Sequence, residues 1–165
     1  MKQAVRYLAP GHFRQDQVLP FGTVVAYING NAGWLATPQG TQDMPAEIVK
    51  QAQGEAFRSL VTLILSDGVA GRTVNAVGPN AVEISGAGQV ARLEFDLSGL
   101  PTKLAYTDAG QPETVETYTD FRDVSGVKLP FKTAVQQSGQ PAGSATVSSY
   151  TLNTGITAEE IGKRP

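Results

Sequence analysis

The sequence of 165 residues contains no cysteine and a single histidine, His12. The lack of cysteine excludes a disulfide, a thiol nucleophile and a thiolate metal site. A zinc site built on His12 would need carboxylates at metal-ligand spacing, and the sequence offers no such cluster. Because His12 directly follows the Pro10-Gly11 turn signal, we expect it to be a surface residue.

Charge and long apolar runs are also scarce. Charged residues make up 17% of the chain, 13 basic and 15 acidic, which gives a net charge of −2 with no run of either sign. A nucleic-acid-binding surface needs a basic face to neutralise phosphates, so this composition argues against that class of partner. No apolar run approaches the about 20 residues of a membrane-spanning helix, and residues 1–10 are too polar for a secretion signal. The length suits one domain with its own core.

One stretch alone has helical periodicity, and it runs from Pro45 to Leu65. Proline suits a first helical turn because its missing N–H would have no partner there. Asp43 or Met44 is expected to be the N-cap, and Asp43 is chemically the better of the two. Gly54, in the middle, predicts a kink, a break into two helices or a close approach to a sheet. The apolar residues of the second half follow the spacing i, i+3, i+4 and i+7 of one helical face: Phe57, Leu60, Val61 and Ile64.

The rest of the chain is typical of β-strands. Its 18 glycines and 10 prolines fall mainly between short apolar runs, which is the punctuation of a many-stranded sheet. Asn29-Gly30 predicts a hairpin turn, and residues 38–44 predict a loop that leads into the helix. The clearest alternation runs from Gln89 to Leu97, where one face carries Ala91, Leu93, Phe95 and Leu97 and the other carries Arg92, Glu94 and Asp96.

The C-terminal part continues the same pattern. The last strand is predicted from Ala145 to Leu152, with a β-bulge near Ser148-Ser149, and Thr157 with Glu160 forms the capping box of a final helical turn. Without a strand–helix–strand rhythm, a parallel sheet is not expected. We therefore predict a mainly β fold, a curved antiparallel meander that forms a half-open barrel around one central helix. Residues 1–165 are predicted to be one domain, and their abrupt start in strand-like sequence indicates a piece of a longer protein.

Sequence motifs for catalysis are not convincing. Gly86-Ala87-Gly88 precedes a strand, whereas a nucleotide-binding loop precedes a helix. No Gly-x-Ser-x-Gly elbow accompanies His12. The carboxylate pairs Glu113/Glu116 and Asp120/Asp123 could be imagined as a glycosidase dyad, but ordinary solvated strand and turn charges explain them better. The only tryptophan, Trp34, is favoured as a core residue, with a place at the rim of a cavity as the alternative.

Three stretches resemble a known family. The letters YINGNAGWLATPQGTQDMPAEIVKQ, ARLEFDLSGLPTKLAYTD and ETYTDFRDVSGVKLPFKTAV resemble hairpin motifs of the outer-membrane lipoprotein-sorting-like (LolA/LolB-type) group, whose half-open β-barrels wrap around helices. The chain looks most like the C-terminal non-catalytic domain of bacterial insulinase-like (pitrilysin-type) zinc peptidases. Those enzymes bind zinc through His-x-x-Glu-His on a separate domain, and that motif is absent here.

The resemblance implies a non-catalytic accessory or binding domain without a metal or cofactor of its own. Its apolar concave face would hold a lipid, a lipoprotein or a peptide segment, and its other partners would be upstream peptidase domains of the same chain, in the bacterial envelope or periplasm. The alternatives are a structural module that docks a peptidase core through a sheet edge and, third, a hydrolase in its own right. Large apolar residues on the expected inward faces are the candidates for lining the cavity: Tyr27, Trp34, Phe57, Leu60, Phe95, Tyr106, Phe121 and Phe131.

Overall fold

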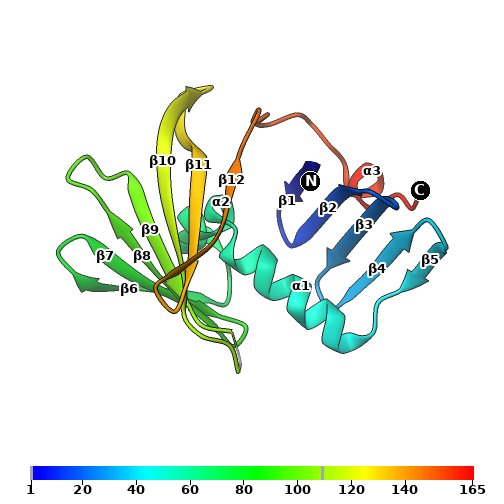
Figure 1. The fold of residues 1–165 in the computed structure, drawn as a ribbon, viewed down its shortest axis with the longest axis horizontal. Coiled ribbons are helices and arrows are strands. Elements are labelled where there is room, and N and C mark those ends of the chain that lie inside the picture. The colour runs from blue at the N-terminus through cyan, green and yellow to red at the C-terminus, as the bar shows by residue number, and fades with distance from the viewer. Residues whose placement is uncertain (1, 109) are drawn as a thin grey trace. The chain divides into compact units, whose positions relative to one another are not determined.

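The computed structural model describes residues 2–108 and 110–165. Its strands form two antiparallel meanders, a five-stranded sheet in the order β1-β2-β3-β4-β5 and a seven-stranded sheet in the order β12-β11-β10-β9-β8-β7-β6 (Figure 1). The predicted class, a mainly β fold in which a curved antiparallel meander packs with a helix, is confirmed, and the strands belong to two sheets. In the part of the chain that the structure describes, no helix has the length and apolar character needed to cross a membrane.

The chain divides into two compact units. The first contains residues 1–62 and 153–165, and the second contains Leu63–Leu152. The first unit is therefore built from both ends of the sequence, so its C-terminal segment must return to strands formed at the beginning of the chain.

The first unit is a sheet with helices packed on it. Its strands are β1 (Lys2–Leu8), β2 (His12–Leu19), β3 (Gly22–Asn29), β4 (Ala32–Thr37) and β5 (Gly40–Asp43). The predicted hairpin after Asn29 is confirmed, since Asn29 pairs with Ala32 across a two-residue turn. The prediction of a loop over residues 38–44 is wrong in part, because the exposed strand β5 adds to the sheet by pairing with β4.

Helix α1 (Ala46–Arg58) packs on one face of the five-stranded sheet. Its Val49 forms a buried cluster with Phe13 of β2 and Ile28 of β3, whose side chains share a face because the two residues are direct partners in the ladder. Pro45 occupies the N-cap position without a side-chain hydrogen bond. The expected cap, Asp43, is the last residue of β5 and forms an ion pair with Arg164.

The helix predicted from Pro45 to Leu65 is interrupted at Ser59, and α2 (Leu60–Ile64) follows. Ser59 has a ψ of 126°, which is incompatible with a continuing helix. The Thr62 hydroxyl lies 2.6 Å from the carbonyl oxygen of Ala56 and 3.0 Å from that of Phe57, so it provides a partner for carbonyls that the helix end leaves without one. The break also changes which residues are buried: Thr62 and Leu63 are buried, whereas Ile64 is 38% exposed.

The second unit is the seven-stranded sheet with a short 3₁₀ turn, η1 (Ser66–Gly68), before it. Its strands are β6 (Arg72–Gly78), β7 (Ala81–Gly86), β8 (Gln89–Phe95), β9 (Pro101–Tyr106), β10 (Thr114–Val124), β11 (Val127–Gln137) and β12 (Gln140–Thr146). The last strand lies earlier than the predicted 145–152, and the irregularity in its pairing falls opposite Val135/Gln136 of β11, not near Ser148-Ser149.

The alternation of β8 is confirmed for Ala91 and Leu93, which are both 1% exposed. Its extension to Leu97 is wrong, because β8 ends at Phe95 and Leu97 is 96% exposed. The carboxylate of Asp96 accepts hydrogen bonds from the backbone N–H groups of Ser98, at 2.8 Å, and Leu100, at 3.0 Å. These bonds stabilise a turn in place of a further strand residue.

The C-terminal segment ends in helix α3 (Ala158–Gly162). The predicted capping box is confirmed: the Thr157 hydroxyl accepts a hydrogen bond from the backbone N–H of Glu160, and the Glu160 carboxylate accepts one from the backbone N–H of Thr157. Ile161 of this helix is fully buried, and α3 packs on β1 and β2 of the first unit.

Candidate functional site

One face of the seven-stranded sheet carries the buried apolar side chains of its middle strands, Ile84, Ala91, Leu93 and Leu104. The pairing of Ile84 with Ala91, and of Leu93 with Val82 and Leu104, fixes which side chains share this face. We define the apolar face by these residues and the partners that continue their rows on neighbouring strands: Val74, Val82, Ile84, Ala91, Leu93, Leu104, Tyr106, Glu116 and Tyr118.

Coverage of the apolar face differs from strand to strand. Leu93 is 1% exposed and Leu104 0%, whereas Val74 on the edge strand β6 is 40% exposed. Val82 and Tyr106 are half-buried. The face therefore stays apolar even at positions such as Val74, which are not buried in the core.

The opposite face of the same sheet carries charge. Glu94 forms ion pairs with Arg92, at 3.3 Å, and with Lys103 of the neighbouring strand, at 3.5 Å. Glu83 and Arg92 on this side are exposed and directly paired across β7 and β8. One face of the sheet is thus exposed to solvent and the other is packed, as the alternation in the sequence predicts.

Among the residues that define the apolar face, Glu116 carries the one carboxylate. The Tyr118 hydroxyl donates to Oε2 of Glu116 at 2.9 Å, and the Tyr106 hydroxyl donates to Oε1 at 3.2 Å. Glu116 pairs with Leu104 in the ladder, so it is held beside the most buried leucine of the sheet. We call Tyr106, Glu116 and Tyr118 the tyrosine–glutamate cluster.

The local electrostatics keep the phenol of Tyr118 neutral. Burial, and then the negative charge of Glu116, raise the pKa of Tyr118 far above its ordinary value. Tyr118 is therefore a hydrogen-bond donor at any physiological pH. In the described part of the chain no ion pair reaches Glu116, so phenol hydrogen bonds stabilise its carboxylate without an opposite charge.

The eight predicted lining residues are divided equally between the units. Tyr27, Trp34, Phe57 and Leu60 belong to the first unit, and Phe95, Tyr106, Phe121 and Phe131 belong to the second. Whether they line one cavity stays a prediction. Within the second unit, Tyr106 lies on the apolar face. Phe121 pairs with Pro130, one position out of step with Phe131, whose ring meets that of Tyr150 edge-on at 5.2 Å.

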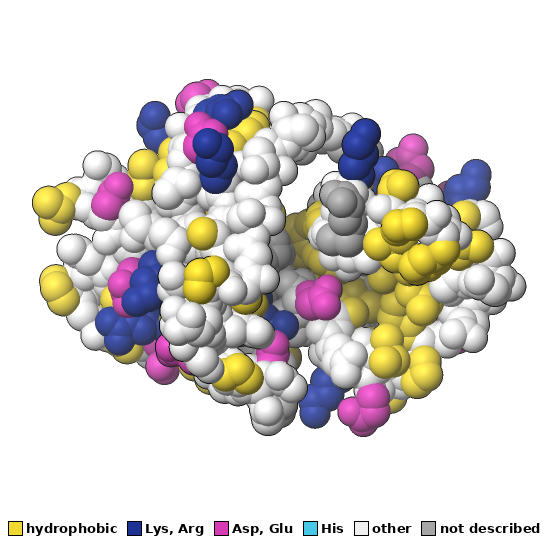
Figure 2. Space-filling model, viewed as in Figure 1, with side chains coloured by type: hydrophobic (Ala, Val, Ile, Leu, Met, Phe, Trp, Pro, Cys, Tyr) yellow, Lys and Arg dark blue, Asp and Glu magenta, His cyan; other side chains and the backbone are white. Residues whose placement is uncertain are grey.

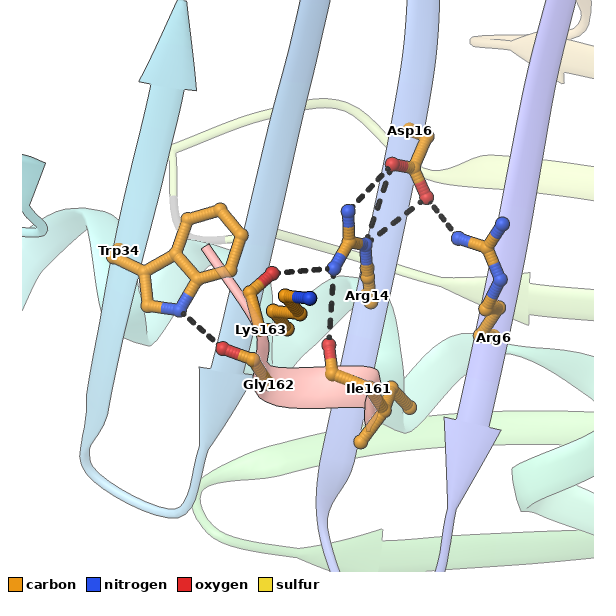
Figure 3. A network of polar contacts seen from close by, with 7 residues as sticks. All are labelled: Arg6, Arg14, Asp16, Trp34, Ile161, Gly162 and Lys163. Carbon is orange, nitrogen blue, oxygen red and sulfur yellow. Dashed lines mark hydrogen bonds and ion pairs between the residues drawn. The ribbon is translucent and has the colours of Figure 1, made fainter. Parts of the chain in front are cut away.

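In the first unit, Tyr27 and Trp34 are direct partners across β3 and β4, with ring centroids 5.5 Å apart. The indole N–H of Trp34 donates to the carbonyl of Gly162 at 3.2 Å, and Trp34 is only 4% exposed. Trp34 is buried in a cluster with Val25 and Ala36, and the returning C-terminal segment adds the hydrogen-bond acceptor of its indole (Figure 3).

Arg14 joins the same segment to the sheet. Its Nη1 donates to the carbonyls of Lys163, at 2.8 Å, and Ile161, at 3.3 Å, and its Nη2 contacts the Asp16 carboxylate at 3.1 Å. Asp16 also binds Arg6, and the Arg14 guanidinium lies 5.6 Å from the centre of the Trp34 ring. Figure 3 shows Arg14 between the carbonyls of Ile161 and Lys163 on one side and Asp16 and Arg6 on the other. Through these hydrogen bonds the polar network provides partners for the last carbonyls of α3, so its role is structural.

Exposed hydrophobic side chains of the first unit do not form a second site. On the face shown in Figure 2, yellow side chains gather over the five-stranded sheet. The large exposed ones are Val5, Val18, Phe21 and Ile48. Val5 lies on the face of Phe13, Val18 lies on the opposite face, and Phe21 lies in a turn. Val5 and Val18 therefore lie on opposite faces of the sheet and do not belong to one patch.

The remaining sequence candidates have ordinary partners. His12, expected at the surface, is half-buried, and its Nδ1 lies 2.8 Å from the Tyr27 hydroxyl. Asp120 binds Arg122, and Asp123 accepts the backbone N–H of Gly126 in a turn. Among residues 2–108 and 110–165, no group of three or more His, Asp or Glu side chains could hold a metal ion.

Sequence reasoning weighed Glu116 only as half of a carboxylate dyad and missed its tyrosine partners. The signal was present in Thr114 to Tyr118, because period-two alternation places Glu116 in phase with Tyr118. The contribution of Tyr106 needs the pairing of β9 with β10, in which Tyr106 is the partner of Thr114.

Comparison with known proteins gives one structural similarity. No protein-family model matches the sequence, and no curated protein matches it. The fold is similar to the crystal structure of a LolA superfamily protein from Nitrosomonas europaea, with a TM-score of 0.48 and 10% identity, over 90% of this chain and 83% of that chain.

Proposed function

We propose that this chain is a non-catalytic binding domain that holds an apolar ligand segment, such as an acyl chain, the lipid-bearing end of a lipoprotein or an apolar peptide. The observation that carries the proposal is the apolar face of the seven-stranded sheet. It extends from fully buried Leu104 to Val74, which stays apolar at 40% exposure. The resemblance of the three hairpin motifs to the lipoprotein-sorting-like group supports the same class of ligand.

A displacement titration tests this proposal directly. A fluorescent fatty acid is titrated into the intact chain and then displaced by decanoate. We expect saturable binding at a single class of sites. A signal that rises linearly without saturation, or that decanoate does not displace, would count against an apolar ligand site.

Two valines of the same sheet provide matched variants. Val74 lies on the apolar face, since it pairs with Ile84, and Val90 lies on the charged face, since it pairs with Ser85. Their exposures are 40% and 53%, so neither substitution opens the core. We expect Val74→Asp to weaken fatty-acid binding at least about tenfold, because a carboxylate on an apolar contact surface has to be desolvated. Val90→Asp should leave binding unchanged.

We also propose, from the resemblance alone, that the chain accompanies an insulinase-like zinc peptidase domain in the bacterial envelope. In that setting the alternative function is an interaction module that docks the peptidase through a sheet edge. The strand β1 favours this alternative in one respect, since its residues from Lys2 to Arg6 are exposed along an edge of the sheet. Binding of a peptidase domain that survives Val74→Asp but is lost on replacing Val5 by Pro would support the docking role.

A further inference from the structure

We propose that Glu116 on the apolar face is a recognition site for a primary ammonium group carried by the ligand. The inference rests on the proposed function, and it specifies which chemical group the ligand has beside its apolar part. The shared chemistry is an alkylammonium ion, found in a lipid ethanolamine headgroup and in a lysine or N-terminal amine of a peptide.

The first argument is the unused acceptor capacity of the carboxylate. A carboxylate offers about four acceptor positions. The two phenols use one on each oxygen, at 2.9 Å and 3.2 Å. The two phenols also fix the orientation of the carboxylate, because each is attached to a strand of the same sheet, Tyr118 to β10 and Tyr106 to β9.

The second argument is the missing opposite charge. Within the described residues Glu116 has no ion pair, although Arg and Lys neutralise Asp16, Glu94 and Asp120 elsewhere in the chain. A half-buried carboxylate beside an apolar surface is stabilised strongly by a cation that shares its site. An ammonium ion supplies both the charge and the N–H donors that the free acceptor positions require.

The third argument is the aromatic surroundings. Tyr106 and Tyr118 flank the carboxylate on the same face of the sheet. The faces of aromatic rings attract cations, and the attraction increases where water is displaced. An anionic head group would instead meet the negative charge of Glu116. The cluster therefore selects an amine over a carboxylate at the end of the same alkyl chain.

The experiment compares probes that share one chain length. Decylammonium, decanoate and decyltrimethylammonium are titrated into the intact chain by calorimetry, each below its micellar concentration. We expect decylammonium to bind at least about tenfold more tightly than decanoate. It should also bind more tightly than decyltrimethylammonium, which has the charge but no N–H donor. Equal affinity for decylammonium and decanoate would overturn the inference, and equal affinity for the two cations would overturn the assignment to a primary amine.

Glu116→Gln removes the charge with little change in shape. It should weaken decylammonium binding roughly tenfold to a hundredfold, as expected for a lost charged hydrogen bond, while decanoate binding stays the same or improves. Glu83→Gln, on the charged face of the same sheet, is the matched control and should change neither affinity. If Glu116→Gln does not fold, the preference of the unmodified chain between the two probes still decides.

The outcomes separate this inference from the proposed function. If decanoate and decylammonium bind equally and Glu116→Gln changes neither, the apolar site stands and the ammonium site falls, leaving the cluster a purely structural link between β9 and β10. If none of the probes binds, both proposals fail. If decylammonium binds as expected, two further ligands identify the source of the amine. They are a decanoyl lysophosphatidylethanolamine and an acetylated apolar peptide with one lysine. The ligand whose binding Glu116→Gln weakens carries the recognised amine, and no effect on either ligand counts against the inference.

Discussion

Leu97 and Leu104 show how strongly the role of one residue type depends on its position. Leu97 lies in the turn between β8 and β9 and is 96% exposed, whereas Leu104 lies in β9 and is 0% exposed. The difference arises because the Asp96 carboxylate binds the backbone of Ser98 and Leu100 and ends the strand. Their contributions to the free energy of unfolding should differ accordingly.

We expect Leu104→Ala to lower the free energy of unfolding by about 2–5 kcal/mol, the usual cost of a cavity in a packed core. Leu97→Ala should change it by less than about 0.5 kcal/mol. Urea unfolding followed by circular dichroism measures both. Comparable losses in the two variants would show that the turn at Leu97 is packed against something in solution.

Tyr118 gives a prediction about alkaline pH. Its pKa is raised by burial and by Glu116, so the folded state holds the phenol proton more tightly than the unfolded state does. The resulting stabilisation is fully present below the ordinary tyrosine pKa of about 10 and is lost as the pH rises above it. Burial also raises the pKa of Tyr27 and Tyr150, which adds to the same trend.

Replacing Tyr118 by Phe should therefore reduce the dependence of stability on pH above about 10. At neutral pH the variant should be less stable because it loses the hydrogen bond to Glu116, and the gap to the unmodified chain should narrow as the pH rises. Unfolding free energies measured from pH 7 to 11 check this, together with phenolate absorbance. A constant gap over that range would contradict the raised pKa.

At the scale of elements, helix α1 contains the buried Gly54 and strand β4 contains the half-buried Gly33. The two glycines differ in the neighbours that an added Cβ atom would meet. A Cβ atom on Gly54 would lie 2.8 Å from Nη1 of Arg58, the far end of a flexible side chain. A Cβ atom on Gly33 would lie 2.5 Å from the backbone oxygen of Tyr27 and 2.8 Å from Cγ2 of Ile28. The helix can adjust to the extra atom, but the hairpin of β3 and β4 cannot.

Gly54→Ala should raise the free energy of unfolding by about 0.5–1 kcal/mol, because alanine loses less backbone entropy in a helix. Gly33→Ala should lower it by about 1–3 kcal/mol, as overpacking does in a close contact. Thermal unfolding of the two variants side by side measures the signs. A loss in Gly54→Ala would mean that the Arg58 side chain cannot move without breaking its own interactions.

At the scale of the whole molecule, the chain returns to its beginning to complete the first unit. The segment from Asn153 onward belongs with residues 1–62 and places the buried Ile161 and the Gly162 carbonyl against that sheet. Since Trp34 is the only tryptophan, its fluorescence reports on its own surroundings, which include this contact.

A chain that ends after Leu152 should show tryptophan emission at longer wavelength and a lower unfolding temperature, because the indole loses its hydrogen bond and its cover. A chain that ends after Lys163 is the control. It retains the carbonyls bound by Arg14 and Trp34 and loses only the exposed ion pair between Arg164 and Asp43, so it should behave like the full chain. Unchanged emission in the shorter chain would show that Trp34 is protected by other residues.

The sequence by itself determined the class of fold and much of its local chemistry. The alternation of Ala91 with Arg92 and of Leu93 with Glu94, the hairpin after Asn29 and the capping box of Thr157 with Glu160 each depend on neighbours only a few residues away, and all three were predictable. Local preferences of this kind are expressed wherever the segment lies, because backbone period and capping do not require distant partners.

Tertiary structure decided what distant residues do to one another. The division of the strands between two sheets and the contact of Trp34 with Gly162 join segments whose mutual distance no local pattern records. The break of the helix at Ser59 is stabilised in part by the buried Thr62 hydroxyl, which lies within hydrogen-bond distance of the carbonyls of Ala56 and Ser59. For the same reason, only one of the two tyrosine partners of Glu116 was predictable from the sequence. Alternation places Glu116 on the same side as Tyr118, whereas pairing between β9 and β10 brings Tyr106 to the other carboxylate oxygen.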